Sequence, residues 1–187
     1  MNVRPNRTAL ACLFALALPC LSHAADYTVQ PSASTLGFSG SFQGSSFDGH
    51  FDKWTAAIRY DQAKLAASKF DVTVDLSSAK TGDSDRDGAL PGTDFFNVAK
   101  YPQAHFVTTG FRQQGAQVIA DGNLTLRGVT KPVSLVVAFK PQGSGATLDV
   151  SGSVKRLDFG VGGGQYADTS VIGPDVKISA HLVLAAK

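Results

Sequence analysis

Glutamate is absent from this sequence of 187 residues, and all 15 of its acidic residues are aspartates. Cysteine is nearly absent too: Cys12 and Cys20 are the only two, and both lie close to the N-terminus. The lack of glutamate removes many familiar patterns of general acid–base catalysis and metal binding. No G-x-S-x-G sequence occurs either, so the sequence gives no support to a nucleophilic serine.

The N-terminal segment has the pattern of a secretory signal peptide. Arg4 and Arg7 precede an apolar run of 13 residues, 9–21, and Ser22-His23-Ala24 then offers small residues at the −3 and −1 positions of a cleavage site. An apolar run of this length is too short to span a bilayer. We therefore expect a signal peptide over residues 1–24, cleavage after Ala24, and export of the remaining chain.

The mature domain would then cover residues 25–187. It would contain no cysteine, which excludes a disulfide, a thiol nucleophile and a cysteine metal site. Loss of two arginines lowers the formal net charge from +2 to 0. A neutral chain argues against nucleic-acid binding, which depends on neutralising phosphates. No further apolar run reaches the length of a membrane-spanning helix.

Apolar and polar residues alternate through most of this domain, which indicates half-buried antiparallel strands. The clearest runs cover residues 70–76, 133–139, 148–154 and 176–184. Further candidate strands cover residues 27–30, 35–41, 46–52, 55–60, 105–111 and 117–126.

Glycine and proline mark the boundaries of these runs. Gly143-Ser144-Gly145 predicts a hairpin turn, and Asp121-Gly122 indicates either a turn or a β-bulge. Residues 84–103 break the alternation and predict short helical turns and loop. Eight or more strands with few helices predict an all-β domain, either a two-sheet sandwich or a closed barrel.

Aromatic residues are the second notable feature of the domain. Phe38, Phe42, Phe47 and Phe51 cluster among glycines in its first third, and within each pair of the same strand the two rings share a parity. The rings either fill an ordinary core or line a cavity. An eight-stranded barrel has room for one small ligand, and apolar walls would select a lipid.

A calcium-loop pattern, D-x-D-x-D-G, begins at Asp83, and Asp94 falls at its twelfth position. Three features oppose calcium binding within residues 83–94. The final ligand would be the short aspartate, a strand rather than a helix precedes the loop, and Arg86 adds a positive charge. We favour a solvated loop in which Arg86 pairs with aspartate.

Two other patterns give weak signals for a site. The glycine-rich stretch 160–164 lacks the following helix and Lys-Ser/Thr of a phosphate-binding loop. His50, His105 and His181 are dispersed, and the first and last lie on the polar face of their strands. The sequence therefore predicts no metal site and no catalytic residues.

An ordered series of motifs resembles the YceI-like family, bacterial periplasmic proteins that bind polyisoprenoid lipids. The motifs are Arg86-Asp87, Leu90 and DFF at 94–96, then KYPQA at 100–104, GNLTLRGVTKPV at 122–133 and RLDFGVG at 156–162. The resemblance extends over residues 26–186. It implies a lipocalin-like antiparallel barrel of about eight strands, whose apolar pore holds an isoprenoid tail. It also implies a periplasmic location, no cofactor and no catalytic activity.

On this resemblance we expect aromatic and aliphatic side chains to line the pore, namely Phe38, Phe42, Phe47, Phe51, Phe95, Phe96, Phe106, Leu124, Leu135 and Val137. Three arginines in the matched motifs, Arg86, Arg127 and Arg156, are candidates for contact with a phosphate or quinone headgroup. The alternative is that these arginines pair with aspartates at strand ends.

The chain departs from the usual family pattern at two places. Ala89 stands where many members carry histidine, and Gln165-Tyr166 stands where one branch has Glu-Trp. The neighbouring residues resemble that branch, whose members occur beside, or fused to, b-type membrane cytochromes. A second hypothesis is therefore an accessory subunit that docks a membrane cytochrome.

Overall fold

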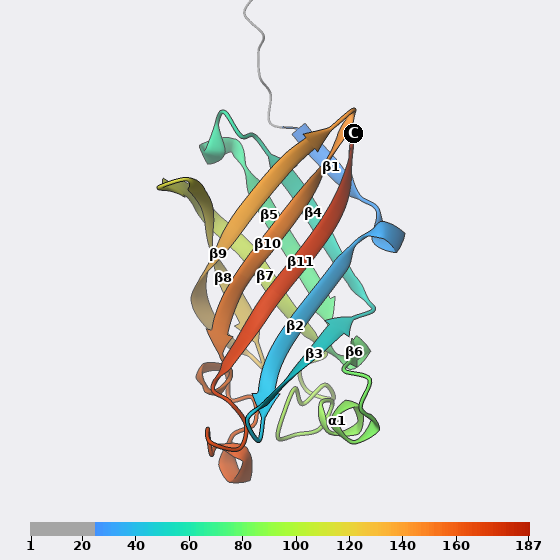
Figure 1. Cartoon of the computed structure of the whole chain (residues 1–187), viewed down its shortest axis with the longest axis vertical. Helices are drawn as coiled ribbons and strands as arrows, with labels where there is room; N and C mark the ends of the chain where they lie inside the picture. Colours follow the sequence, from blue (N-terminus) through green and yellow to red (C-terminus); the bar gives the residue numbers. More distant parts are fainter. Residues whose placement is uncertain (1–24) are drawn as a thin grey trace, which may run out of the picture.

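The computed structural model describes residues 25–187; the expected signal peptide, residues 1–24, lies outside the described part. One antiparallel sheet dominates the described chain (Figure 1). Its strands are β1 (Ala25–Val29), β2 (Thr35–Phe42), β3 (Ser45–Phe51), β4 (Trp54–Tyr60), β5 (Lys69–Asp75), β6 (Ala79–Lys80), β7 (Gln103–Gln114), β8 (Gln117–Leu126), β9 (Val129–Gln142), β10 (Gly145–Lys155) and β11 (Asp175–Ala186).

Helical structure within residues 25–187 is limited to short segments. They are the α-helix α1 (Ser84–Ala89) and the 3-10 helices η1 (Pro31–Ala33), η2 (Leu65–Ala67), η3 (Leu76–Ser78), η4 (Arg156–Phe159) and η5 (Gly164–Tyr166). None of these helices is long and apolar enough to cross a membrane. The Asp83 side chain caps α1 by accepting hydrogen bonds from the backbone N–H groups of Asp85 and Arg86. The prediction of short helical turns in this region is confirmed.

Eight of the strands form a closed ring in the order β1, β4, β5, β7, β8, β9, β10 and β11. Pairing of β1 with β11, from Tyr27 opposite Ala186 to Val29 opposite Leu184, closes the ring. Every pairing in the ring is antiparallel. The prediction of a lipocalin-like antiparallel barrel is therefore confirmed.

The other three strands form a branch that extends the barrel wall. β2 pairs with β11 below the end of β1, β3 pairs with β2, and the short β6 pairs with β3. β11 therefore has β1 as its neighbour near the C-terminus and β2 as its neighbour in its middle. In Figure 1 this branch lies toward the same end of the barrel as α1.

The predicted turns had different outcomes. A turn at Gly143, where φ is +57°, joins β9 to β10 as predicted. Asp121-Gly122 forms no turn, because β8 continues through it. The irregularity lies opposite, in β7, where the register shifts between Thr108 and Gly110. Gly122 is needed for space, since a Cβ there would lie 2.6 Å from the Phe106 ring.

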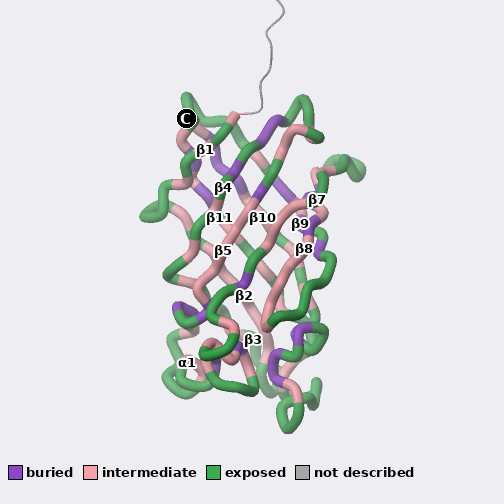
Figure 2. The backbone as a smooth tube through the Cα atoms, turned by 180° about the vertical axis from the view of Figure 1, so that it is seen from behind, coloured by how far each residue is buried: buried purple, intermediate pink, exposed green. Residues whose placement is uncertain are grey.

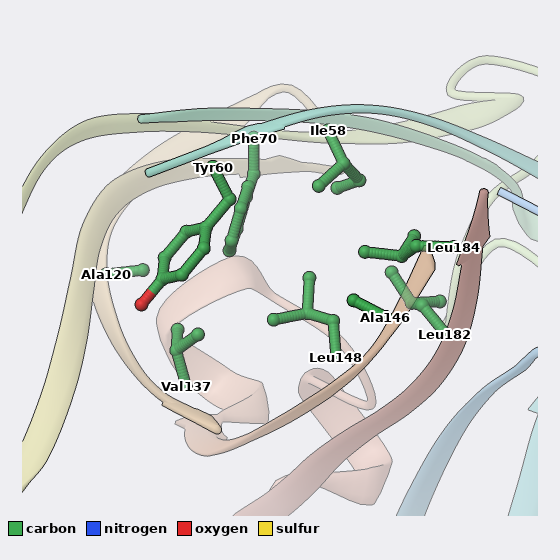
Figure 3. Close-up of a cluster of buried hydrophobic side chains, with 9 residues drawn as sticks. All are labelled: Ile58, Tyr60, Phe70, Ala120, Val137, Ala146, Leu148, Leu182 and Leu184. Atoms are coloured by element: carbon green, nitrogen blue, oxygen red, sulfur yellow. The ribbon is translucent and has the colours of Figure 1, made fainter. Parts of the chain in front are cut away.

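Buried side chains gather in two clusters toward opposite ends of the barrel, and the strands between them are mostly half-buried or exposed (Figure 2). The closed-end cluster, drawn in Figure 3, comprises Ile58, Tyr60, Phe70, Ala120, Val137, Ala146, Leu148, Leu182 and Leu184. The rim cluster lies beneath α1 and the loop after β10, and comprises Leu76, Ala79, Leu90, Phe96, Ala104, Val133, Leu135, Phe159 and Val161. We call the end of the barrel that carries α1, the β2–β3 turn and residues 156–174 the rim.

Candidate functional site

An apolar cavity of about 230 Å³ lies inside the barrel between the two clusters. Alternate residues of the strands point into it because side chains of a strand change face at every step. On β4 these residues are Trp54, Ala56 and Ile58, and on β11 they run from Val176 to Leu182. The alternation noted in the sequence therefore builds the cavity wall.

The floor of the cavity is formed by Ile58, Phe70, Leu148 and Leu182, which belong both to the lining and to the closed-end cluster. Behind the floor the aromatic rings are tightly packed. The Tyr60 ring centroid lies 4.7 Å from that of Phe139 and 6.1 Å from that of Phe70. These rings close the barrel at this end, and Figure 3 shows the side chains meeting across it.

Side chains along the middle of the cavity are only half-buried although they point inward. Leu36, Val72, Val74 and Leu124 belong to this group. The cavity leaves each of them without packing partners on one side. A core filled by its own side chains would bury these residues as fully as Leu148, whose exposed fraction is 0%.

Apart from the indole N–H of Trp54, the polar side-chain groups of the lining lie at the rim. Ser41 supplies the one hydroxyl and Arg156 the one charge among the described lining residues. Exposed apolar side chains lie nearby: Phe42 forms an isolated β-bridge with Ile172, and the Tyr166 ring centroid lies 5.1 Å from that of Phe95. The cavity thus has a polar, partly open end and an apolar, closed end.

Arg156 is 3% exposed and donates all five of its N–H groups to backbone carbonyls. The acceptors lie on the rim loop, residues 161–173, and are the oxygens of Val161, Gly162, Tyr166, Ile172 and Gly173. Burial lowers the pKa of this guanidinium. Pairing of Arg156 with an aspartate, the alternative considered for it, is wrong: carbonyl oxygens take that place and hold the loop to the barrel.

The glycine-rich stretch after η4 has a clear role in this arrangement. Gly162, whose φ is +63°, turns its carbonyl oxygen toward the Arg156 guanidinium. A Cβ at this position would lie 2.7 Å from an Arg156 nitrogen. The stretch therefore surrounds a cation with carbonyls, whereas a phosphate loop presents N–H groups to an anion.

The other two arginines lie outside the cavity lining. Arg86 lies 3.4 Å from an Asp83 oxygen and 4.4 Å from the centroid of the Phe47 ring, which it covers. Arg127 has a φ of +51° and donates a hydrogen bond to the carbonyl oxygen of Phe95. Arg86 therefore pairs with an aspartate, as the alternative for these arginines supposed. Arg127 instead connects two loops of the rim.

Eight of the ten side chains expected in the pore line the cavity: Phe38, Phe47, Phe51, Phe95, Phe96, Phe106, Leu124 and Leu135. The expected placement is wrong for Phe42 and Val137. Phe42 is 41% exposed because β2 ends there, at the turn, beyond the wall that Phe38 helps to form. Val137 is 4% exposed and lies behind the floor, in the closed-end cluster.

Sequence reasoning missed the floor itself. Phe70, Leu148 and Leu182 stand in the alternating runs, so their inward orientation was readable. Their depth was not, because parity distinguishes the two faces of a sheet and carries no information on height along the barrel. Arg156 was recognised as a site candidate, but its carbonyl partners have no residue-type signature in a sequence.

The carboxylates of the calcium-like pattern are directed at separate partners. Asp83 caps α1, and Asp87 accepts hydrogen bonds of 2.7 Å from both the backbone N–H and the hydroxyl of Thr81. The hydroxyl hydrogen bond is the main cause that lowers the pKa of Asp87. Across residues 25–187 no three potential metal-binding side chains converge.

The three histidines of the barrel lie on its outer surface, each beside an aspartate. His105 lies 2.7 Å from Asp71, and His181 lies 2.6 Å from Asp149. His50 is 3.2 Å from Asp52. The side chains of these pairs are between 39% and 58% exposed, and none of them lines the cavity.

Comparison with known proteins finds one family. A model described as the YceI-like domain matches residues 27–184. Protein YceI of Salmonella arizonae is 36% identical over 119 residues, which cover 60% of this chain and 62% of that protein. The counterpart in Salmonella newport is 35% identical over the same length. The match therefore spans less than two thirds of these curated relatives.

Solved structures share the barrel. BcnA of Burkholderia cenocepacia superposes with a TM-score of 0.80 at 30% identity, covering 83% of this chain and 99% of that one. The YCEI protein of Campylobacter jejuni superposes with a TM-score of 0.67 at 26% sequence identity, and the match covers 76% of this chain and 86% of that one. A polyisoprenoid binding domain from Saccharophagus degradans superposes with a TM-score of 0.64 at 20% sequence identity, and the match covers 88% of this chain and 100% of that one. At that identity the likeness supports the fold alone.

Proposed function

The chain belongs to the YceI-like family, and from this premise we propose that it is a non-catalytic binding protein whose barrel holds the tail of an isoprenoid lipid. One observation carries the proposal: an apolar cavity with a closed floor and a polar rim. Such a cavity matches a molecule with a long hydrocarbon tail and a single polar end. The match to the YceI-like domain over residues 27–184 supports the same ligand class.

The energetics favour a tail over a compact polar ligand. Each buried methylene-sized group contributes about 0.8 kcal/mol, so several prenyl units offset the cost of ordering the chain. A polar group carried to the floor would lose its water without gaining a hydrogen bond. Polyprenyl and quinone-type lipids combine the required tail and polar end.

The residues of the lining support binding without catalysis. Its described residues include no carboxylate, imidazole or thiol, and therefore offer no nucleophile next to a base. We propose that the protein sequesters or carries its lipid without a cofactor. Residues 1–24 support export, and we propose the periplasm as the site of action. Neither the geometry nor the comparisons favour the docking of a membrane cytochrome.

The test is native mass spectrometry of the purified protein, followed by lipid extraction. We expect an added mass that corresponds to one prenyl lipid per chain. Ile178 lines the cavity and its neighbour Ser179 faces outward on β11. Ile178→Asp should abolish the added mass, since a carboxylate beside hydrocarbon is unfavourable, and Ser179→Asp should retain it.

Circular dichroism of both variants would establish that each is folded. The proposal fails if the wild-type protein carries no lipid and takes up no added prenyl alcohol. It also fails if a folded Ile178→Asp variant binds as much lipid as the Ser179→Asp control.

A further inference from the structure

The two ends of the cavity impose a direction on any molecule with one polar end. Ser41 and Arg156, the hydroxyl and the charged group of the lining, lie at the rim, whereas the floor consists of Ile58, Phe70, Leu148 and Leu182. The Ser41 hydroxyl makes no hydrogen bond with another residue of the described chain, so it is available to a ligand. A polar end therefore stays at the rim, and the tail end points toward the floor.

The floor lies at a fixed depth. Along β11 the inward-facing residues from rim to floor are Val176, Ile178, Ala180 and Leu182. Six steps of a strand at about 3.4 Å each give roughly 20 Å along β11, which is a depth of about 15 Å along the barrel axis because barrel strands are tilted by roughly 40°. The next inward residue, Leu184, is 2% exposed and lies in the closed-end cluster, behind the lining.

The floor is backed by packed side chains. Leu148 is completely buried, and the Phe70 ring lies edge-on to Phe111 with centroids 4.9 Å apart. Tyr60 packs against Phe70 from behind. Interiors packed in this way move little to admit extra atoms, so a tail cannot lengthen the cavity at this end.

We propose that Phe70 and Leu148 set the longest isoprenoid tail that the barrel accepts. The polar end is held at the rim and the tail end is stopped at these side chains, so the depth of the cavity limits the length of the tail that can bind. The inference rests on the proposed function, because it assigns specificity to the same cavity. It adds that the protein discriminates among isoprenoids by the number of their prenyl units.

Three variants test this limit. Leu148→Ala removes side-chain atoms at the floor and deepens the cavity. Ala180→Phe adds a ring on the wall just above the floor and makes the cavity shallower. Leu157→Ala is the matched control, because Leu157 is 37% exposed on η4 and does not line the cavity, and it loses the same atoms as Leu148.

The probe is a ladder of linear prenyl alcohols, from geranylgeraniol to undecaprenol, offered together to each delipidated protein. Native mass spectrometry then reads the bound chain length. Leu148→Ala should shift the preference toward longer alcohols, since it removes three carbon atoms at the place where the tail ends. Ala180→Phe should prefer shorter ones, and Leu157→Ala should match the wild type.

Equal preferences in Leu148→Ala, Ala180→Phe and the wild type would overturn the proposal, as would a shift in Leu157→Ala equal to that of Leu148→Ala. If Leu148→Ala does not fold, Ala180→Phe decides alone, because it adds atoms to open space and creates no void. Failure of the wild type to bind any alcohol is a different result: it would overturn the proposed function itself.

Discussion

The closed end of the barrel and its rim are held together by opposite means. At the closed end, apolar side chains of eight strands pack against one another around Tyr60 and Phe70. At the rim, one buried cation, Arg156, gathers five backbone carbonyls, and aspartates cap short helices and turns. The closed end is therefore a packed apolar core, whereas the rim is a set of loops held in place by hydrogen bonds.

Arg156→Met would break this comparison at the rim. It leaves five carbonyls without their donors, and we expect a loss of about 4 kcal/mol in the free energy of unfolding. Amide hydrogen exchange should accelerate across residues 161–173 and leave the closed-end strands protected. Arg112 is the control: it forms an exposed pair with Asp121 at 2.7 Å, so Arg112→Met should cost less than about 1 kcal/mol. Equal losses in the two variants would contradict the structural role of Arg156.

A pair of leucine truncations compares packed and open surroundings directly. Leu184 is 2% exposed in the closed-end cluster, and Leu36 is half-buried on the cavity wall. Leu184→Ala should lower the free energy of unfolding by about 3 kcal/mol, because a void remains. Leu36→Ala should lower it by only about 1 kcal/mol, since it enlarges a space that already exists. Urea denaturation measures both; a reversed order would mean that the wall, and not the closed end, is the packed region.

Acid should loosen the rim through its aspartates. Hydrogen bonds from Thr81 and Ser170, mainly those of their hydroxyls, hold the pKa values of Asp87 and Asp168 below the ordinary 3.8. Their stabilisation is therefore complete above 3.8, the unfolded value, and is lost as the pH falls through the lower folded value. Melting temperatures of the wild type and Asp87→Asn should differ most near neutral pH and converge in acid. A difference that stays constant down to about pH 2 would refute this, and Thr81→Val should reproduce the Asp87→Asn profile.

Phe42 should show the smallest effect. Its ring is exposed at the rim and does not line the cavity. Phe42→Ala should change the free energy of unfolding by no more than about 0.5 kcal/mol and leave the bound lipid unchanged. Phe38, two inward positions away on β2, provides the contrast because it does line the cavity. Loss of lipid from Phe42→Ala alone would place the ligand outside the barrel, across the rim.

Alternation in the sequence predicted the strands and their inward faces well, because period-two patterning follows directly from strand geometry. It could not predict height within the barrel, which is why Leu135 and Val137 looked equivalent although only Leu135 meets the cavity. The hydrogen-bond partners of Arg156 could not be predicted from the sequence either, since they are backbone carbonyls and every residue has one. The barrel itself was inferred from family motifs, because the pairing of β1 with β11 depends on residues at opposite ends of the domain.

That pairing has a consequence for how the domain forms. Tyr27 and Ala186 face each other across the strands that close the ring, so the contact spans nearly the whole domain. Contacts between such distant residues slow folding, because the entropy of closing a long loop is lost before the contacts can stabilise the chain. The ring cannot close until the last strand has been synthesised and is free to move. A polypeptide still emerging from a ribosome therefore has no closed ring, and the apolar compartment comes into existence only with the final strand.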